Sequence, residues 1–165
     1  MRQRRSILGT TVFAMVVACA MQAMAQGKQE EQDQILKMSQ VPPKVQQAIQ
    51  QYATASEIKQ ITKGDVDGTI AYEFQIEKGG RKSEVSITPD GRFLASEEEM
   101  PLSEFPDPAR KLIDAQAAGG RVVSTKKILE DGKTVFAAII EKAGKQEEIT
   151  VTPDGKVIDT EAIKR

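Results

Sequence analysis

The sequence predicts an α+β fold of two tandem repeats, in each of which one helix packs on a three- to four-stranded antiparallel sheet. The chain writes one phrase twice, as V-S-I-T-P-D-G-R-F at residues 85–93 and as I-T-V-T-P-D-G-K-V at residues 149–157. Residues 41–94 also align with residues 105–158 at a constant offset of 64, without a gap and with 15 identities in 54 positions. Average composition would give about three identities by chance, so we interpret the chain as a duplication.

Each repeat is expected to begin with a helix. Pro42-Pro43 suit a first helical turn, where a missing N–H costs little, and apolar residues follow at helical spacing from Val45 to Tyr52. In the second repeat Asp107 is a candidate N-cap. Gly119-Gly120 is expected to end that helix, because glycine adopts the left-handed conformation that follows many last turns.

The rest of each repeat is expected to be antiparallel strands joined by tight turns. Residues 69–78 alternate between apolar and polar side chains, which is typical of a strand with one buried face. A first strand is predicted in each repeat, at about 57–63 and 121–129, and a short last strand is predicted at 92–95 and 156–158. Asp-Gly and Pro-Asp-Gly favour tight turns. The predicted structural turn residues are Asp67, Gly68, Gly80, Pro89, Asp90, Gly91, Asp131, Gly132, Gly144, Pro153, Asp154 and Gly155.

The predicted organisation is a repeat at 41–95, a linker at 96–104 and a second repeat at 105–165. A unit of about 55 residues is close to the lower limit for a self-sufficient core, so the two repeats are expected to support each other. The linker carries Glu97-Glu98-Glu99. We interpret this run as a solvated connector, and a weak cation site is the alternative.

Residues 1–25 have the three-part pattern of a secretory signal peptide. Three arginines precede an apolar run of 14 residues, Ile7 to Ala20, and Ala23-Met24-Ala25 gives a small-x-small cleavage pattern, so cleavage is expected after Ala25. The run is shorter than the roughly 20 residues that span a membrane. Residues 26–40 are polar and are interpreted as a spacer. The predicted location is periplasmic or secreted.

Two alternatives for export remain open. Arg4-Arg5 resembles a twin-arginine signal, which is a receptor-read address rather than an anchor. Residues 16–19 loosely resemble a bacterial lipoprotein box, in which case Cys19 would carry the lipid. We favour a cleaved signal in which Cys19 is simply a small apolar residue.

Composition excludes several function classes. Loss of three arginines on cleavage would change the net charge from 23 − 24 = −1 to 20 − 24 = −4, and an acidic product lacks the basic patch of a nucleic-acid binder. The chain has no histidine, and its one cysteine lies in the predicted signal. The commonest general base and most zinc ligands are therefore missing. We predict no enzyme activity, no cofactor and no metal, with a carboxylate-only enzyme as the alternative.

One predicted strand is apolar on both faces. In the second repeat its outward residues are Val135, Ala137 and Ile139. The first repeat has Ala71, Glu73 and Gln75 at these positions. A strand with one face in water should alternate. Either the first repeat, the spacer or the C-terminal tail covers these residues, or they form a patch for a partner or a second copy of the chain.

The motifs together resemble the PepSY and PepSY-like domains of secreted bacterial proteins. The residues that carry the resemblance are Asp67-Gly68, Tyr72, Ile76-Glu77-Lys78 and Glu84 to Gly91, repeated as Asp131-Gly132, Phe136, Ile140-Glu141-Lys142 and Glu148 to Gly155. The sequence is also similar to β-lactamase-inhibitor-like proteins, which present a broad sheet from two tandem αβ units. It departs from that type by having no cysteine in either repeat.

The resemblance implies binding to another protein, including inhibition or modulation of a peptidase, and it implies no catalytic residues. The leading prediction is therefore an exported, non-enzymatic module that binds an envelope or secreted protein through its sheet. Self-association through the same sheet is compatible with this prediction. The alternatives are a small-ligand or cation-binding envelope module and a structural lipoprotein.

Overall fold

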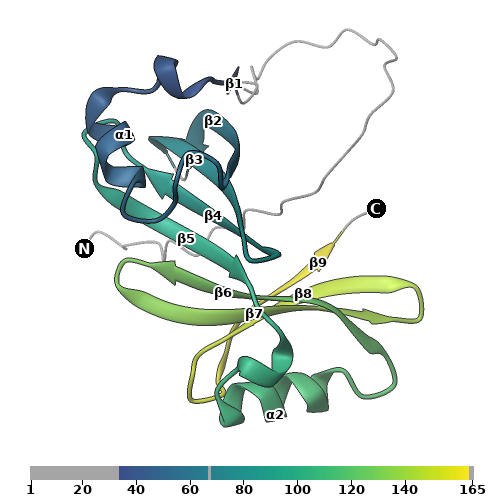
Figure 1. The fold of residues 1–165 in the computed structure, drawn as a ribbon. Helices are drawn as coiled ribbons and strands as arrows, with labels where there is room; N and C mark the ends of the chain where they lie inside the picture. Colours follow the sequence, from purple (N-terminus) through teal and green to yellow (C-terminus); the bar gives the residue numbers. More distant parts are fainter. Residues whose placement is uncertain (1–33, 67, 164–165) are drawn as a thin grey trace, which may run out of the picture.

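The computed structural model describes residues 34–66 and 68–163, and its main element is one antiparallel sheet of nine strands in sequence order (Figure 1). The strands are β1 (Gln34–Ile35), β2 (Ile58–Val66), β3 (Thr69–Lys78), β4 (Arg81–Ile87), β5 (Phe93–Glu99), β6 (Arg121–Glu130), β7 (Lys133–Lys142), β8 (Lys145–Val151) and β9 (Val157–Ile163). The helices are α1 (Pro43–Ile49) and α2 (Asp107–Gln116), with short 3-10 turns η1 (Met38–Gln40) and η2 (Leu102–Glu104).

The predicted fold class is wrong, because the protein is mainly β and its sheet does not stop between the two repeats. β5 pairs with β6 over five residues, from Ala95 opposite Glu130 to Glu99 opposite Lys126. The helices are only seven and ten residues long. A separate four-stranded unit would leave the N–H and C=O groups of its last strand unpaired, and pairing β5 with β6 satisfies them.

The Glu97-Glu98-Glu99 run lies in β5 rather than in a solvated connector. Lys126 Nζ donates to Glu97 Oε2 at 2.9 Å, and Lys127 Nζ donates to Glu98 Oε2 at 2.5 Å. The two pairs lie on opposite faces of the sheet, because successive residues of a strand point to opposite faces. Opposite charges on neighbouring strands thus hold the acidic run in the sheet.

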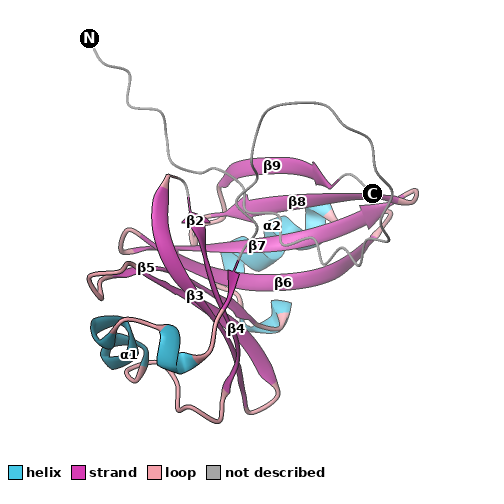
Figure 2. Ribbon diagram, turned by 90° about the horizontal axis from the view of Figure 1, so that it is seen from above, coloured by secondary structure: helices cyan, strands magenta, loops and turns pink. Residues whose placement is uncertain are grey.

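Both helices lie on the same face of the sheet (Figures 1 and 2). Residues directly opposite each other on neighbouring strands lie on the same face of a sheet. Val85 lies opposite Ser96, Ser96 opposite Leu129, and Leu129 opposite Thr134, so all four residues share one face. Val85 belongs to the core under α1, and the strand of Thr134 carries Phe136 of the core under α2. We call the opposite side the helix-free face. Its members include Glu73, Gln75, Glu77, Glu84, Glu97, Lys126, Ile128, Val135, Ala137, Ile139, Glu148, Thr150, Asp159 and Glu161.

Two apolar cores fix the helices to the sheet. Val45 and Ile49 of α1 pack with residues of β3 and β4 that include the fully buried Phe74. Ala109 and Ile113 of α2 pack in the same way with residues of β7 and β8.

Two details of the helices differ from the prediction. Tyr52 follows α1, is 39% exposed and stacks on Phe93 with ring centroids 5.6 Å apart. Asp107 is not the N-cap but the first residue of α2, and its carboxylate accepts a hydrogen bond from Arg110. Pro106 occupies the N-cap position.

The repeated T-P-D-G turn packs closely against the first turn of each helix, with Gly91 next to Lys44 of α1 and Gly155 next to Pro108 of α2. The Thr152 hydroxyl donates to Asp154 Oδ1 at 2.5 Å and accepts from the Lys156 N–H at 3.1 Å, and the first copy has the same bonds. Gly155 has φ +80°, and a Cβ built there would lie 2.8 Å from the Pro108 carbonyl oxygen of α2. Bonds from Lys156 and Thr152 lower the pKa of Asp154. The turn is therefore a close backbone contact as well as a reversal of the chain.

Candidate functional site

The helix-free face carries an apolar strip within its polar surface. Ile128 lies directly opposite Val135, and Ile139 follows on the same side of β7. These three residues, which we call the apolar strip, are half-buried, whereas Ala137 between Val135 and Ile139 is buried. No helix of the described residues packs on this face. The helix-free face therefore presents the partly exposed side chains of the apolar strip, and the small side chain of Ala137 is buried between two of them.

The structure places Val135, Ala137 and Ile139 on one face, as the alternation predicts, but Ala137 contributes almost no exposed surface. Strands β2–β5 of the first repeat continue the same sheet beyond β6. A role for these residues in partner binding stays a prediction. Of the predicted turn residues, Asp67 lies outside the described residues, as do the predicted signal peptide and most of the spacer. The turn glycines of both repeats have positive φ.

Lys126 lies beside the strip, between two carboxylates. Its Nζ is 2.9 Å from Glu97 Oε2 and 3.6 Å from Glu148 Oε2. The side chains of Lys126 and Glu148 are only 20% and 15% exposed. Burial alone would lower the pKa of Lys126, but Glu97 and Glu148 outweigh burial and raise it. One lysine is thus shared by two acidic groups.

Glu148 is the less well compensated partner. Burial raises its pKa above the ordinary value of 4.5, and repulsion from Glu97 and Glu161 adds to the effect of burial, while Lys126 opposes it. The raised pKa of Lys126 and the raised pKa of Glu148 have one explanation. Lys126 has two carboxylates near it, whereas Glu97 and Glu148 must share the single positive charge of Lys126. The site is short of positive charge.

Glu161 of β9 completes this group of side chains. It lies directly opposite Glu148, and its Oε2 atom is buried with no hydrogen-bond partner. Among the described residues, this is the only buried side-chain nitrogen or oxygen without a partner. Leaving such an atom unpaired costs stability, because its hydration is lost and nothing replaces it.

Replacing Glu148 with glutamine is expected to help the protein more as the pH rises. The raised pKa means that the folded protein binds more protons than the unfolded chain at pH values just above 4.5, so the contribution of Glu148 to the free energy of unfolding falls through that window. Glutamine does not titrate. The melting temperature of Glu148→Gln relative to wild type should therefore be higher at pH 7 than at pH 4. An unchanged difference across this range would contradict the assignment.

Sequence reasoning missed Lys126, Glu148 and Glu161. One signal was available: the acidic run at 97–99 is matched by Lys126-Lys127, as expected for adjacent strands. The position of Glu161 at the outermost strand could not be found in this way, because it depends on the order of strands in the sheet.

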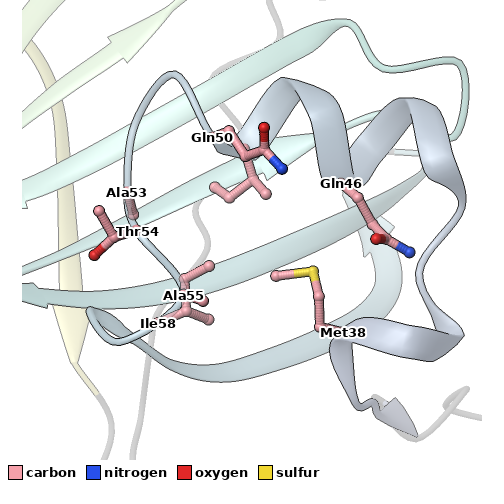
Figure 3. Close-up of a pocket in the computed structure, with 8 residues that line it drawn as sticks. Met38, Gln46, Gln50, Ala53, Thr54, Ala55 and Ile58 are labelled. Carbon is pink, nitrogen blue, oxygen red and sulfur yellow. The ribbon is translucent and has the colours of Figure 1, made fainter.

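A shallow pocket of about 220 Å³ lies elsewhere, between η1, α1 and the start of β2 (Figure 3). It is lined by Met38, Gln46, Ile49, Gln50, Ala53, Thr54, Ala55 and Ile58. None of these side chains is charged, so the pocket is lined by neutral groups alone. Within residues 34–66 and 68–163, no group of three Asp, Glu, His or Cys side chains is placed to hold a metal ion. Over the same residues, no helix has the length and apolar character needed to cross a membrane.

A continuous antiparallel sheet with both helices on one face and a polar opposite face defines a BLIP-like fold. A BLIP-like protein of Bacteroides fragilis matches with a TM-score of 0.60 and 15% identity, over 76% of this chain and 88% of that one. A DUF2874 family protein of Bacteroides uniformis matches with a TM-score of 0.62 and 16% identity, over 74% and 89%. A protein of Bacteroides eggerthii described as a candidate periplasmic protein matches with a TM-score of 0.64 and 22% identity, over 74% and 89%.

At these identities the likeness concerns the fold. It supports the predicted resemblance to inhibitor-like proteins in architecture, whereas the PepSY assignment and the tandem organisation stay predictions. No described protein family and no curated protein matches the sequence.

Proposed function

We propose that this chain is an exported, non-enzymatic binding protein that holds an envelope or secreted protein against the helix-free face of its sheet. The observation that carries the proposal is the apolar strip. Ile128, Val135 and Ile139 lie on the face that no described helix covers, and the ion pairs of Lys126 border them. An apolar centre with a polar rim is the usual anatomy of a protein–protein interface.

The difference between the two halves supports a binding role for this strip. At the offset of 64, Ile128, Val135 and Ile139 replace Gly64, Ala71 and Gln75 of the first half. The first half therefore folds with small or polar side chains at the same places on its sheet. Since the fold does not require bulky apolar residues there, binding is the better explanation for them.

Export and the absence of catalysis rest on other observations. The pattern of residues 1–25 is that of a signal peptide, and one protein of the same fold is described as a candidate periplasmic protein. No histidine occurs in the chain, and Glu148, Asp159 and Glu161 of the helix-free face lie on the neighbouring strands β8 and β9 of the sheet. The resemblance noted above extends the proposal to inhibition or modulation of a peptidase.

Ile139→Gln is expected to weaken partner binding by about tenfold or more, because a central apolar contact of an interface is worth about 1–2 kcal/mol or more. Glutamine is the residue of the first half at this position, so the strand accommodates it. Glutamate would be a poorer choice, since residue 139 faces Glu148 across β7 and β8. The purified chain would be used to capture proteins from the envelope of its host. The captured protein would then be purified, and its dissociation constant measured.

Ile70→Gln is the matched control. Ile70 is 38% exposed and lies on β3, on the side of the sheet that carries the helices. The same chemical change there should leave the dissociation constant unchanged. Equal binding by wild type, Ile139→Gln and Ile70→Gln would refute binding through the strip. If the partner is a peptidase, its activity in the presence of the two variants tests inhibition directly.

A further inference from the structure

Glu161 is the counterpart of Glu97 at the offset of 64 residues, and the two glutamates differ in what lies beside them. Glu97 on β5 accepts a bond from Lys126 of the next strand, β6. Glu161 occupies the same place on β9, which is the outermost strand of the described sheet. No further strand of the described chain can bring a lysine to it. The arrangement that satisfies Glu97 is therefore incomplete at Glu161.

The surroundings of Glu161 add to this shortage. Its cross-strand neighbour Glu148 already shares Lys126 with Glu97. Asp159, two residues earlier, points to the same face of β9. The Oε2 atom of Glu161 remains buried and unpaired. A cation arriving at this position would meet a preformed group of carboxylates beside Ile139.

We propose that the partner supplies a lysine or arginine that enters across the β9 edge and pairs with Glu161, as Lys126 pairs with Glu97. The proposal rests on the proposed function, and it gives that function a chemistry. The partner is a protein segment in which a basic residue is flanked by apolar residues that contact the apolar strip. Opposite charges at an interface mainly set partner choice and the rate of association, and the carboxylates along β8 and β9 select a basic segment.

The two roles of Glu161 can be separated by one substitution. Glu161→Gln removes a charge that faces Glu148 and has an unpaired buried oxygen, so the free protein should melt at a higher temperature than wild type. The same substitution removes the anchor for the basic residue, so binding should weaken. A residue with a purely structural role would not give these opposite effects. Glu77→Gln, at an exposed residue of β3 on the same face, removes the same charge far from β9 and serves as the control.

The test selects peptides from a random 12-residue library displayed on phage, with the purified protein as bait. Enriched peptides are synthesised, and their dissociation constants are measured by fluorescence anisotropy against wild type, Glu161→Gln, Glu77→Gln and Ile139→Gln. We expect a consensus with a lysine or arginine beside apolar residues. Glu161→Gln should weaken binding about tenfold, Glu77→Gln should not, and the loss should shrink at high salt because ions screen the pair.

The outcomes distinguish the two proposals. Peptides without a basic residue that bind wild type and Glu161→Gln equally, yet bind Ile139→Gln weakly, would overturn the role of Glu161 and leave the proposed function in place. Peptides that bind wild type and Ile139→Gln equally would overturn both. A lower melting temperature of Glu161→Gln would also overturn the proposal, because the carboxylate would then be satisfied in the free protein.

Discussion

Phe74→Ala is expected to lower the free energy of unfolding by about 3–5 kcal/mol, the usual cost of removing a fully buried phenylalanine side chain. Phe74 is 0% exposed and belongs to the core under α1. Because β5 and β6 join the two halves in one sheet, we expect the loss to appear throughout the molecule. The protein should unfold in a single transition.

The composition of the chain provides a direct check of this cooperativity. There is no tryptophan, and both tyrosines, Tyr52 and Tyr72, lie in the first half. Tyrosine fluorescence therefore follows the first half, while far-ultraviolet circular dichroism follows all strands. Urea unfolding curves from the two probes should coincide for wild type and for Phe74→Ala.

Phe136→Ala is the matched variant in the second half, where Phe136 packs on Phe105 with ring centroids 4.7 Å apart. If the sheet is one cooperative unit, this change shifts the tyrosine transition although no tyrosine is near it. A tyrosine transition that stays at its wild-type midpoint would show that the halves unfold separately. In that case the β5–β6 pairing would be a contact between two domains.

Gly155→Ala is expected to destabilise the protein by about 3 kcal/mol, because it combines a left-handed backbone with a steric clash. At φ +80° any side chain is strained, and here the new Cβ would also meet the Pro108 carbonyl oxygen at 2.8 Å. That oxygen belongs to the backbone of α2, so it cannot turn away. Relief requires that α2 move from the sheet.

Gly132→Ala separates the two causes. Gly132 has φ +70°, but nothing lies within 4 Å of a Cβ built there. Only the backbone strain remains, and we expect a loss of about 1 kcal/mol. The measurement is the urea concentration at the unfolding midpoint of each variant. At an unchanged dependence of the unfolding free energy on urea concentration, a shift of this midpoint reports the loss of stability. Equal losses would show that the T-P-D-G turn is only a chain reversal and does not hold the helix in place.

The sequence predicted local structure better than the arrangement of the sheet. Alternation in residues 69–78 and the turn glycines reflect interactions between neighbouring residues, and β3 and these turns lie where the patterns place them. The strands predicted at 92–95 and 156–158 are longer than predicted and end at Glu99 and Ile163. The halves join where β5 pairs with β6, and there the charge of Glu97 is matched by Lys126, which lies 29 residues later in the sequence. Without that partner, three consecutive glutamates are typical of solvent-exposed chain. The fold class was wrong for this reason.

The same limit applies to the candidate site. Outward-facing Val135 and Ile139 could be predicted from alternation alone, while the burial of Ala137 depends on its larger neighbours. Glu161 resembles an ordinary exposed glutamate in the sequence. Its unusual position follows only from the knowledge that β9 is the last strand.

The strand order has a consequence for how the chain reaches its folded state. Each strand pairs with the strand that precedes it in the sequence. Chains with mostly local pairing close short loops and fold quickly, unlike β proteins whose strands must wait for distant partners. A chain that emerges N-terminus first can therefore add each hairpin to a completed edge. The sheet can therefore assemble in the order of synthesis, and β9 is the last strand to be added.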